Sequence, residues 1–312
     1  LTEASKVDTA HNSAAKISLL QQRITDEFAK AMGFRADGGM RRLLAGIVTN
    51  PTRRFSALMS RADDAAQANG LHGASRSLVK DMGIQVNALG AEQIPPHGPA
   101  LVVSNHPASY DSACILSVIP RANLRIIVYE TQFYHGLEHL APLFIMVSTD
   151  RARRFNALRA AISHLQSGGA LVTFGSGLIE PDPQAQPGII ASLADWSPSL
   201  EAMLRKVPQT AVVHCCVSGV VMPRYLRSPL TLLRSKPKDK RRLAEFLQIA
   251  DMAVRGNPPE NPVEITFSPP LTIADYQSMA QETLSNAVRS RQAALVEQHL
   301  QRLAAQGIPV YR

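Results

Sequence analysis

Seven short runs of mostly apolar and β-branched residues alternate with helix-period segments, and this alternation constrains the fold more than any other feature. The runs cover residues 84–90, 100–104, 124–130, 144–149, 170–175, 210–221 and 263–268. Segments with apolar residues at three- and four-residue steps lie between them, at residues 110–119, 155–168 and 197–207. Such alternation is typical of an α/β fold, so we expect a mixed, largely parallel sheet covered by helices on both faces.

The two ends of the chain are predicted to be helical. Apolar residues recur at helical spacing in 13–34 and again in 41–70, with an expected interruption at Asn50-Pro51. We therefore expect an N-terminal helical subdomain over residues 1–84 and an α/β domain over 85–312. The second domain is predicted to end in one long amphipathic helix over 272–306, capped by Thr272 with Asp275 three residues on.

The cysteines and the apolar runs indicate where in the cell the protein works. The three cysteines are an odd number and include an adjacent pair, which favours a reducing compartment. His214–Cys216 lacks zinc-ligand spacing, so we expect a core strand there and no metal site. No apolar run approaches the roughly 20 residues of a membrane-spanning helix. We expect a cytoplasmic protein, either soluble or lying on a membrane surface.

The positive charge is concentrated in one stretch. The net charge is +8, and residues 224–242 hold eight Lys or Arg against one acid. Such a cluster suits phosphate groups of lipid or nucleic acid, and a solvated basic loop is an equally open interpretation. Only 5% of residues are aromatic, without the aromatic–basic interleaving typical of nucleic-acid binding, so no nucleic-acid partner is expected.

Two polar, turn-rich segments directly follow predicted strands, where α/β sheets collect their ligands. The first, "NHPASYD" at 105–111, contains His106 and Asp111. An imidazole can take a proton from an attacking hydroxyl, and a carboxylate can orient that imidazole. On spacing alone, the plainer interpretation is favoured: Asp111 as a helix cap and His106 as a turn residue.

The surroundings of this loop carry a family resemblance. A strand followed by Asn-His, four residues and Asp resembles the first motif of the glycerolipid acyltransferases, the lysophosphatidate and glycerol-3-phosphate acyltransferase superfamily. "PLFIMVSTDRARR", "LVTFGSGLIEPDP" and "TAVVHCCVSGVVMPRY" follow in the order of that family's later blocks. The resemblance covers roughly residues 85–225 and departs from the family where Phe-Pro-Glu-Gly is replaced by residues 174–177, Phe-Gly-Ser-Gly.

The resemblance implies roles for individual residues. His106 would be the general base and Asp111 its orienting carboxylate. Substrate binding would fall to Asn105, to Arg151, Arg153 and Arg154 as phosphate ligands, to the turn of Gly175, Ser176 and Gly177, and to Glu180 in place of the missing motif glutamate. N–H groups of this turn are candidates for holding an oxyanion or phosphate, although a simple tight turn is the plainer interpretation for each glycine.

The resemblance also implies the reaction and the partners. A fatty acyl group would pass from acyl-CoA or acyl carrier protein, a co-substrate rather than a cofactor, to glycerol-3-phosphate, lysophosphatidate or a related lipid. The basic patches would hold the protein peripherally on the inner face of a membrane. Two alternatives stay open at this point: a non-catalytic lipid-binding protein on the same scaffold, and an acyl-thioester hydrolase.

Overall fold

The computed structural model describes residues 14–27, 39–232, 235, 237–279 and 283–311. Each of the seven predicted runs forms a strand of one sheet, in the order β1-β7-β6-β2-β5-β3-β4. The strands are β1 (Val86–Leu89), β2 (Ala100–Ser104), β3 (Leu124–Tyr129), β4 (Phe144–Val147), β5 (Ala170–Phe174), β6 (Ala211–Ser218) and β7 (Val263–Phe267). Only the β6–β7 pair is antiparallel among these strands, so the predicted mixed, largely parallel sheet is confirmed.

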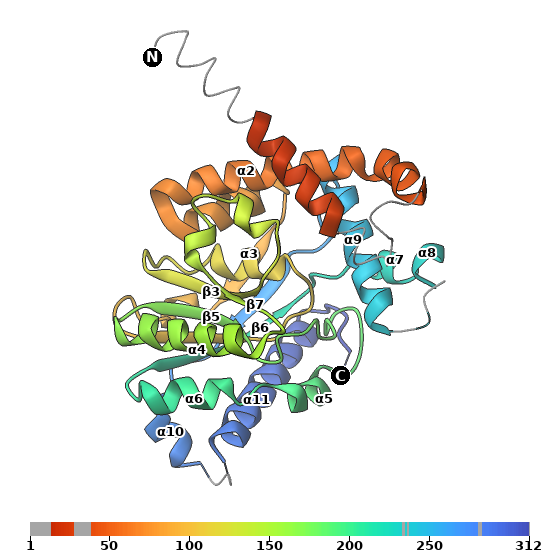
Figure 1. The fold of residues 1–312 in the computed structure, drawn as a ribbon. Helices are drawn as coiled ribbons and strands as arrows, with labels where there is room; N and C mark the ends of the chain where they lie inside the picture. Colours follow the sequence, from red (N-terminus) through yellow and green to blue (C-terminus); the bar gives the residue numbers. More distant parts are fainter. Residues whose placement is uncertain (1–13, 28–38, 233–234, 236, 280–282, 312) are drawn as a thin grey trace.

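Helices cover both faces of the sheet (Figure 1). The α-helices from residue 39 onward are α2 (Gly39–Asp81), α3 (Asp111–Leu116), α4 (Arg151–Gln166), α5 (Ile189–Ser192), α6 (Ser199–Lys206), α7 (Pro223–Leu226), α8 (Pro229–Leu232), α9 (Pro237–Arg255), α10 (Ile273–Gln277) and α11 (Leu284–Ala305). Short 3-10 helices lie at Ala91–Gln93 (η1), Tyr134–Gly136 (η2), Ala141–Leu143 (η3) and Leu193–Asp195 (η4).

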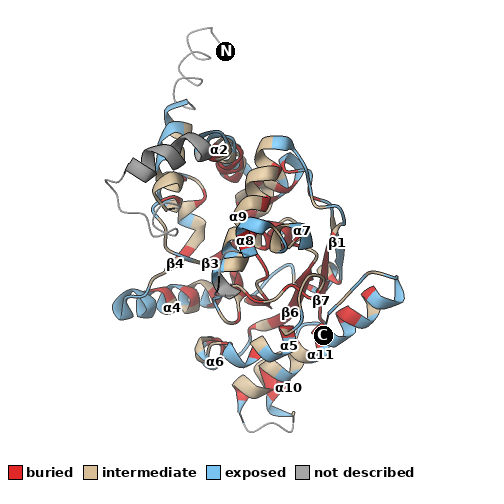
Figure 2. Ribbon diagram, turned by 90° about the vertical axis from the view of Figure 1, so that its right-hand side faces the viewer, coloured by how far each residue is buried: buried red, intermediate tan, exposed pale blue. Residues whose placement is uncertain are grey.

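Strand β2 shows how one sequence run serves both layers. All five of its residues are buried. Val102 packs into the core shared with α2, α3 and α9, whereas Leu101 and Val103 pack into the core shared with α4, α6 and α11. Successive side chains of a strand point to opposite faces, so a continuous apolar run is needed where both faces are covered. The buried positions accordingly gather in the sheet and on the helix faces turned toward it (Figure 2).

The N-terminal helices differ from expectation in where they break. Residues 14–27 are helical, and α2 continues through Pro51, so the predicted interruption at Asn50-Pro51 is wrong. The break lies instead at Asn69 and Gly70, where Gly70 has φ 58° and ψ −154°. This backbone conformation is open to glycine and strained for other residues. Helix α2 packs against α3 and α9, and the proposed domain division near residue 84 stays a prediction.

The predicted single C-terminal helix is in fact two helices. Thr272 and Asp275 form the expected capping box, but the helix that they start, α10, ends at Gln277. Thr283 then caps α11, its hydroxyl accepting a hydrogen bond from the Asn286 N–H at 3.1 Å. A second N-cap satisfies the free N–H groups of a new helix start, so the apolar periodicity resumes in a separate helix.

Helix α11 covers two buried histidines. His214, in the run predicted as a core strand, lies fully buried in β6, and its Nδ1 is 2.9 Å from Gln292 Oε1 and its Nε2 2.6 Å from the Tyr276 hydroxyl. His299 of α11 is 2.7 Å from both the Ser218 and the Thr266 hydroxyls. Burial lowers the pKa of His214 to about 4 and that of His299 to about 3, so both are held neutral.

Candidate active site

The loop that follows β2 is anchored by its first residue. Asn105 is fully buried, and its amide NH2 donates to the carbonyl of Val217 in β6 while its amide oxygen accepts from the Val217 N–H, each at 2.9 Å. Both groups of the side chain are therefore occupied. The side chain therefore ties the loop to the neighbouring strand, and its role in substrate binding stays a prediction.

The side chains of His106 and Asp111 are in direct contact. His106 Nδ1 lies 2.9 Å from Oδ2 and 3.1 Å from Oδ1 of Asp111, the first residue of α3, whose side chain is fully buried. Asp111 Oδ2 also accepts the Ala108 N–H at 3.1 Å, which closes the turn. With a carboxylate at Nδ1, the neutral ring carries its proton there, and Nε2 is left as the basic nitrogen.

The face of the His106 imidazole is also held by a neighbouring side chain. Phe174, at the end of β5, stacks on the imidazole with the centroids 3.9 Å apart and the planes 18° from parallel. The His106 side chain is 18% exposed, so the ring keeps limited access to solvent. Burial lowers the pKa of His106, but the charges of Asp111, Glu245 and Glu180 together outweigh burial and leave that pKa raised.

Glu180 lies against the same loop. It is 3% exposed, and its Oε2 accepts the His106 N–H while its Oε1 accepts the Trp196 indole N–H, both at 2.9 Å. Its own N–H donates to the carbonyl of His106 at 2.7 Å. Burial raises the pKa of Glu180 to about 7, against the opposing effect of these hydrogen bonds. Both carboxylate oxygens thus bind protein groups around His106.

The turn of residues 175–177 packs closely beside this site. A Cβ on Gly175 would come within 1.9 Å of the Trp196 ring, so the close approach of the indole requires glycine. The N–H groups of Gly175 and Gly177 donate to the carbonyls of Ser104 and Phe174. These two donors are already used within the protein, so we withdraw their expected oxyanion role. The Ser176 hydroxyl donates to the carbonyl of Leu178 at 3.1 Å.

The three predicted phosphate-binding arginines lie further along the rim. Arg151, Arg153 and Arg154 form the exposed first turn of α4, and Arg153 pairs with Glu130 at 2.7 Å. Helix α4 follows β4, which is three strands from β2 in the sheet. At about 4.8 Å between neighbouring strands, this places the turn roughly 14 Å from the His106 loop. The arginines share the rim with His106, and their phosphate-binding role stays a prediction.

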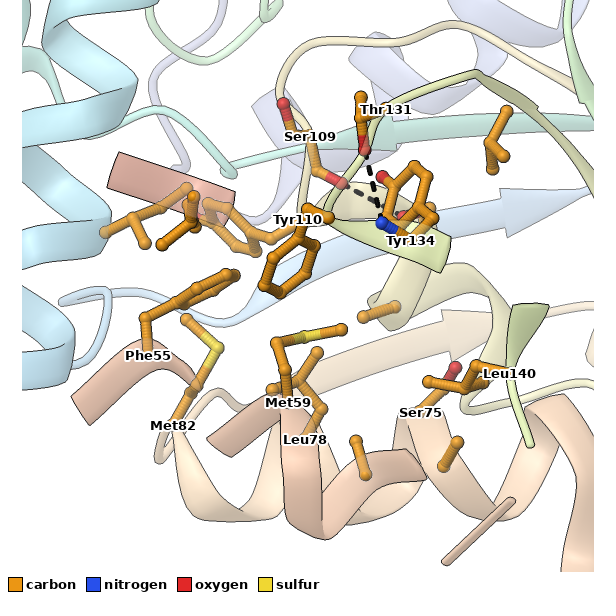
Figure 3. A pocket seen from close by; sticks show the side chains of 18 of the residues that line it. Phe55, Met59, Ser75, Leu78, Met82, Ser109, Tyr110, Thr131, Tyr134 and Leu140 are labelled. Atoms are coloured by element: carbon orange, nitrogen blue, oxygen red, sulfur yellow. Dashed lines mark hydrogen bonds between the residues drawn. The ribbon is translucent and has the colours of Figure 1, made fainter. Parts of the chain in front are cut away.

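A cavity of about 550 Å³ lies beside the loop, mainly between α2, α3, α9 and β3. Its lining is mostly apolar, with Phe55, Met59 and Leu78 from α2 and Met82 directly after it, and Ser109 and Tyr110 of the loop reach its wall (Figure 3). Its walls come from several elements far apart in the chain, so no local sequence pattern predicts this cavity. Helical periodicity in 41–70 indicated a packed face without showing that the face lines a hollow.

Residues 85–216 match the Acyltransferase family model, a segment that runs from β1 into β6 and includes His106 and Asp111. No curated protein matches the chain. Among solved structures, the chain is similar to the 1-acyl-sn-glycerophosphate (LPA) acyltransferase PlsC from Thermotoga maritima, at 17% sequence identity and a TM-score of 0.45, over 81% of this chain and 82% of that one.

Proposed function

Residues 85–216 carry the acyltransferase family pattern, and we propose that the protein is an O-acyltransferase acting on a lipid hydroxyl. The acyl donor is a thioester of coenzyme A or acyl carrier protein, and the acceptor is glycerol-3-phosphate, lysophosphatidate or a related lipid. The observation that carries the proposal is the His106–Asp111 pair, with its carboxylate fully buried, placed at a strand end in a loop that reaches an apolar cavity. A base next to an apolar cavity suits chemistry on a fatty acyl chain.

The proposed mechanism uses the imidazole twice. Nε2 of His106 takes the proton of the acceptor hydroxyl as its oxygen attacks the thioester carbonyl carbon. Asp111 stabilises the imidazolium that forms at this step. The tetrahedral intermediate then collapses, the C–S bond breaks, and His106 returns the proton to the departing thiolate. The products are an ester and a free thiol, and no serine nucleophile is required.

The cavity is proposed to hold the acyl chain. Its lining combines apolar side chains of α2 with Tyr110 and Ser109, which lie in the same loop as His106. Burying an apolar chain there is favourable by about 0.8 kcal/mol for each methylene removed from water. This binding energy would hold the thioester carbonyl near Nε2 of His106.

Acceptor recognition is proposed to rest on the arginines of α4. Arg151 and Arg154 are exposed at the rim, and a guanidinium suits a phosphate because it donates in a fixed fork. Glu180 is proposed to act on the loop rather than on the acceptor, since both of its oxygens already accept hydrogen bonds from His106 and Trp196.

A lipid acceptor requires contact with a membrane, and we propose peripheral binding to anionic lipid on its inner face. No helix within the described residues is long and apolar enough to cross a bilayer. Leu230 and Leu232 of α8 are 55% and 60% exposed, beside the exposed Arg227 and the basic start of α9. Apolar side chains flanked by cations are the usual features of an interfacial surface.

The decisive experiment is thiol release from acyl-CoA and acyl carrier protein over a panel of acceptors. The proposal expects release that depends on an acceptor and falls by about 10²- to 10⁴-fold in His106→Ala. Fatty acid released equally with and without acceptor would favour the hydrolase alternative. Salt-sensitive vesicle binding with no thiol release for any acceptor would favour the non-catalytic alternative.

A further inference from the structure

Helix α9 reaches the His106 loop from outside the family-matched segment. Glu245 lies near the middle of α9 and accepts a hydrogen bond from the backbone N–H of Ser109, three residues after His106. Ser109 is exposed and lines the apolar cavity, so the same loop carries the imidazole and part of the wall of the proposed acyl site. The matched segment ends at residue 216, and neither a motif nor the spacing pointed to Glu245.

The next turn of α9 holds the following loop residue. Gln248, which is 1% exposed, donates to the Tyr110 hydroxyl and to the carbonyl of Val220, each at 2.7 Å. Its amide oxygen accepts the Met222 N–H at 2.9 Å. Glu245 and Gln248 are three residues apart and therefore lie on one face of the helix. That face binds two consecutive residues of the loop, Ser109 and Tyr110.

We propose that Glu245 is a positioning residue of the acyltransferase site, holding the His106 loop in its working geometry through the Ser109 N–H. The inference rests on the proposed function for its catalytic meaning. Three carboxylates from three elements then surround the His106 segment: Asp111 from α3 on Nδ1, Glu180 from the segment after β5 on the backbone N–H, and Glu245 from α9 on the Ser109 N–H.

The arrangement gives α9 two tasks. Arg242, Phe246, Ile249 and Ala250 of the same helix line the cavity. A shift of α9 would therefore move a cavity wall and the anchor of the loop together. A displacement of the base by about 1 Å is enough to cost roughly 100-fold in rate.

Two substitutions separate the hydrogen bond from the charge. Glu245→Gln keeps an oxygen that can accept the Ser109 N–H, and Glu245→Ala removes it. We expect Glu245→Ala to lower kcat by about 10- to 100-fold, and Glu245→Gln to recover most of that loss. Removing the negative charge also lowers the pKa of His106, so the acid limb of kcat/KM in Glu245→Gln should move to lower pH. Glu297→Gln, at an exposed position of α11, is the matched control.

Two measurements do not depend on turnover. Hydrogen exchange of the Ser109 amide should be faster in Glu245→Ala than in the wild type, and NMR titration of His106 should give a lower pKa in Glu245→Gln. Wild-type kcat and unchanged Ser109 exchange in Glu245→Ala would overturn the proposal. A wild-type protein that releases no thiol would refute the enzyme assignment alone, because the exchange and titration still decide whether Glu245 holds the loop.

Discussion

His106 and Glu180 are joined by two hydrogen bonds, one in each direction. The His106 N–H donates to the Glu180 carboxylate at 2.9 Å, and the Glu180 N–H donates to the His106 carbonyl at 2.7 Å. The segment after β5 is thereby locked to the loop after β2. The proposed base is held by its backbone as well as by its ring.

Glu180→Gln tests this lock. Both side-chain partners of Glu180, the His106 N–H and the Trp196 indole N–H, are donors, and an amide has only one oxygen to accept them. One buried N–H loses its acceptor, which should cost about 1–3 kcal/mol of unfolding free energy. We expect kcat to fall while the KM for the acceptor changes little. A raised acceptor KM with unchanged kcat would instead assign Glu180 to acceptor binding.

A double-mutant cycle sharpens the same test. Trp196→Phe removes one of the two donors, so the amide of Glu180→Gln then has a single N–H left to satisfy. The loss in the double variant should be smaller than the sum of the two single losses. Additive losses would mean that the indole and the carboxylate act independently.

Asp111→Asn should disable the base while keeping the shape of the loop. The amide can present its NH2 group to Nδ1, which would favour the tautomer with the proton on Nε2. We expect kcat to fall by about 10³- to 10⁴-fold, with a thermal midpoint close to that of the wild type. Acyl-dependent thiol release measures the first quantity and circular dichroism the second. Near-wild-type kcat would remove Asp111 from the mechanism.

The pH dependence of activity follows from the same pair. His106 acts as a base only when neutral, and the surrounding carboxylates raise its pKa above the usual 6.5. The acid limb of kcat/KM should therefore lie above pH 6.5, with activity lost as the pH falls through it. An acid limb near pH 5 would contradict the assignment of His106 as the base.

The two buried histidines between the sheet and α11, His214 of β6 and His299 of α11, predict loss of stability in acid. Their folded-state pKa values, about 4 for His214 and about 3 for His299, lie below the unfolded value near 6.5. Below pH 6.5 the two histidines are protonated in the unfolded chain but stay neutral in the folded protein. The free energy of unfolding therefore falls as the pH falls toward 4. Each histidine lowers the free energy of unfolding by at most about 1.4 kcal/mol for each unit by which the pH falls.

The raised pKa of Glu180 makes the folded protein more stable as the pH falls, which opposes the effect of the histidines. The histidine effect is therefore measured as a difference between the wild type and a histidine variant. Urea unfolding of the wild type and of His214→Gln at pH 7, 6 and 5 should give a shallower pH slope for the variant. Equal slopes would show that His214 titrates alike in the folded and unfolded states.

Narrowing the cavity should change the preferred acyl chain. Ala74 of α2 is buried and lines the cavity, so Ala74→Phe should lower kcat/KM for long acyl donors more than for short ones. Ala304→Phe, at an exposed site of α11, is the matched control. An equal loss for all chain lengths would mean that the acyl chain does not lie in this cavity.

Local sequence patterns determined much of this protein. Short apolar runs are readable in the sequence because a strand covered on both faces, such as β2, needs apolar residues throughout, and all seven strands were located correctly. The His106–Asp111 contact was predictable because only four residues separate the two, and the family resemblance rather than the spacing favoured it over a simple helix cap. The break at Gly70 was wrongly expected at Pro51, which the helix tolerates, and the break before α11 was missed, because the second N-cap at Thr283 is a single residue within a long periodic pattern.

Only the tertiary structure decided what surrounds that pair. Phe174, Glu180 and Glu245 meet the loop from separate elements, and Asn105 turns away from it to bind Val217 of β6. The cavity likewise needs α2, α3, α9 and β3 at once. A short motif predicts the chemical groups that its own residues bring to a site. Contacts between segments far apart in the chain depend on how the helices pack on the sheet, which no local pattern specifies.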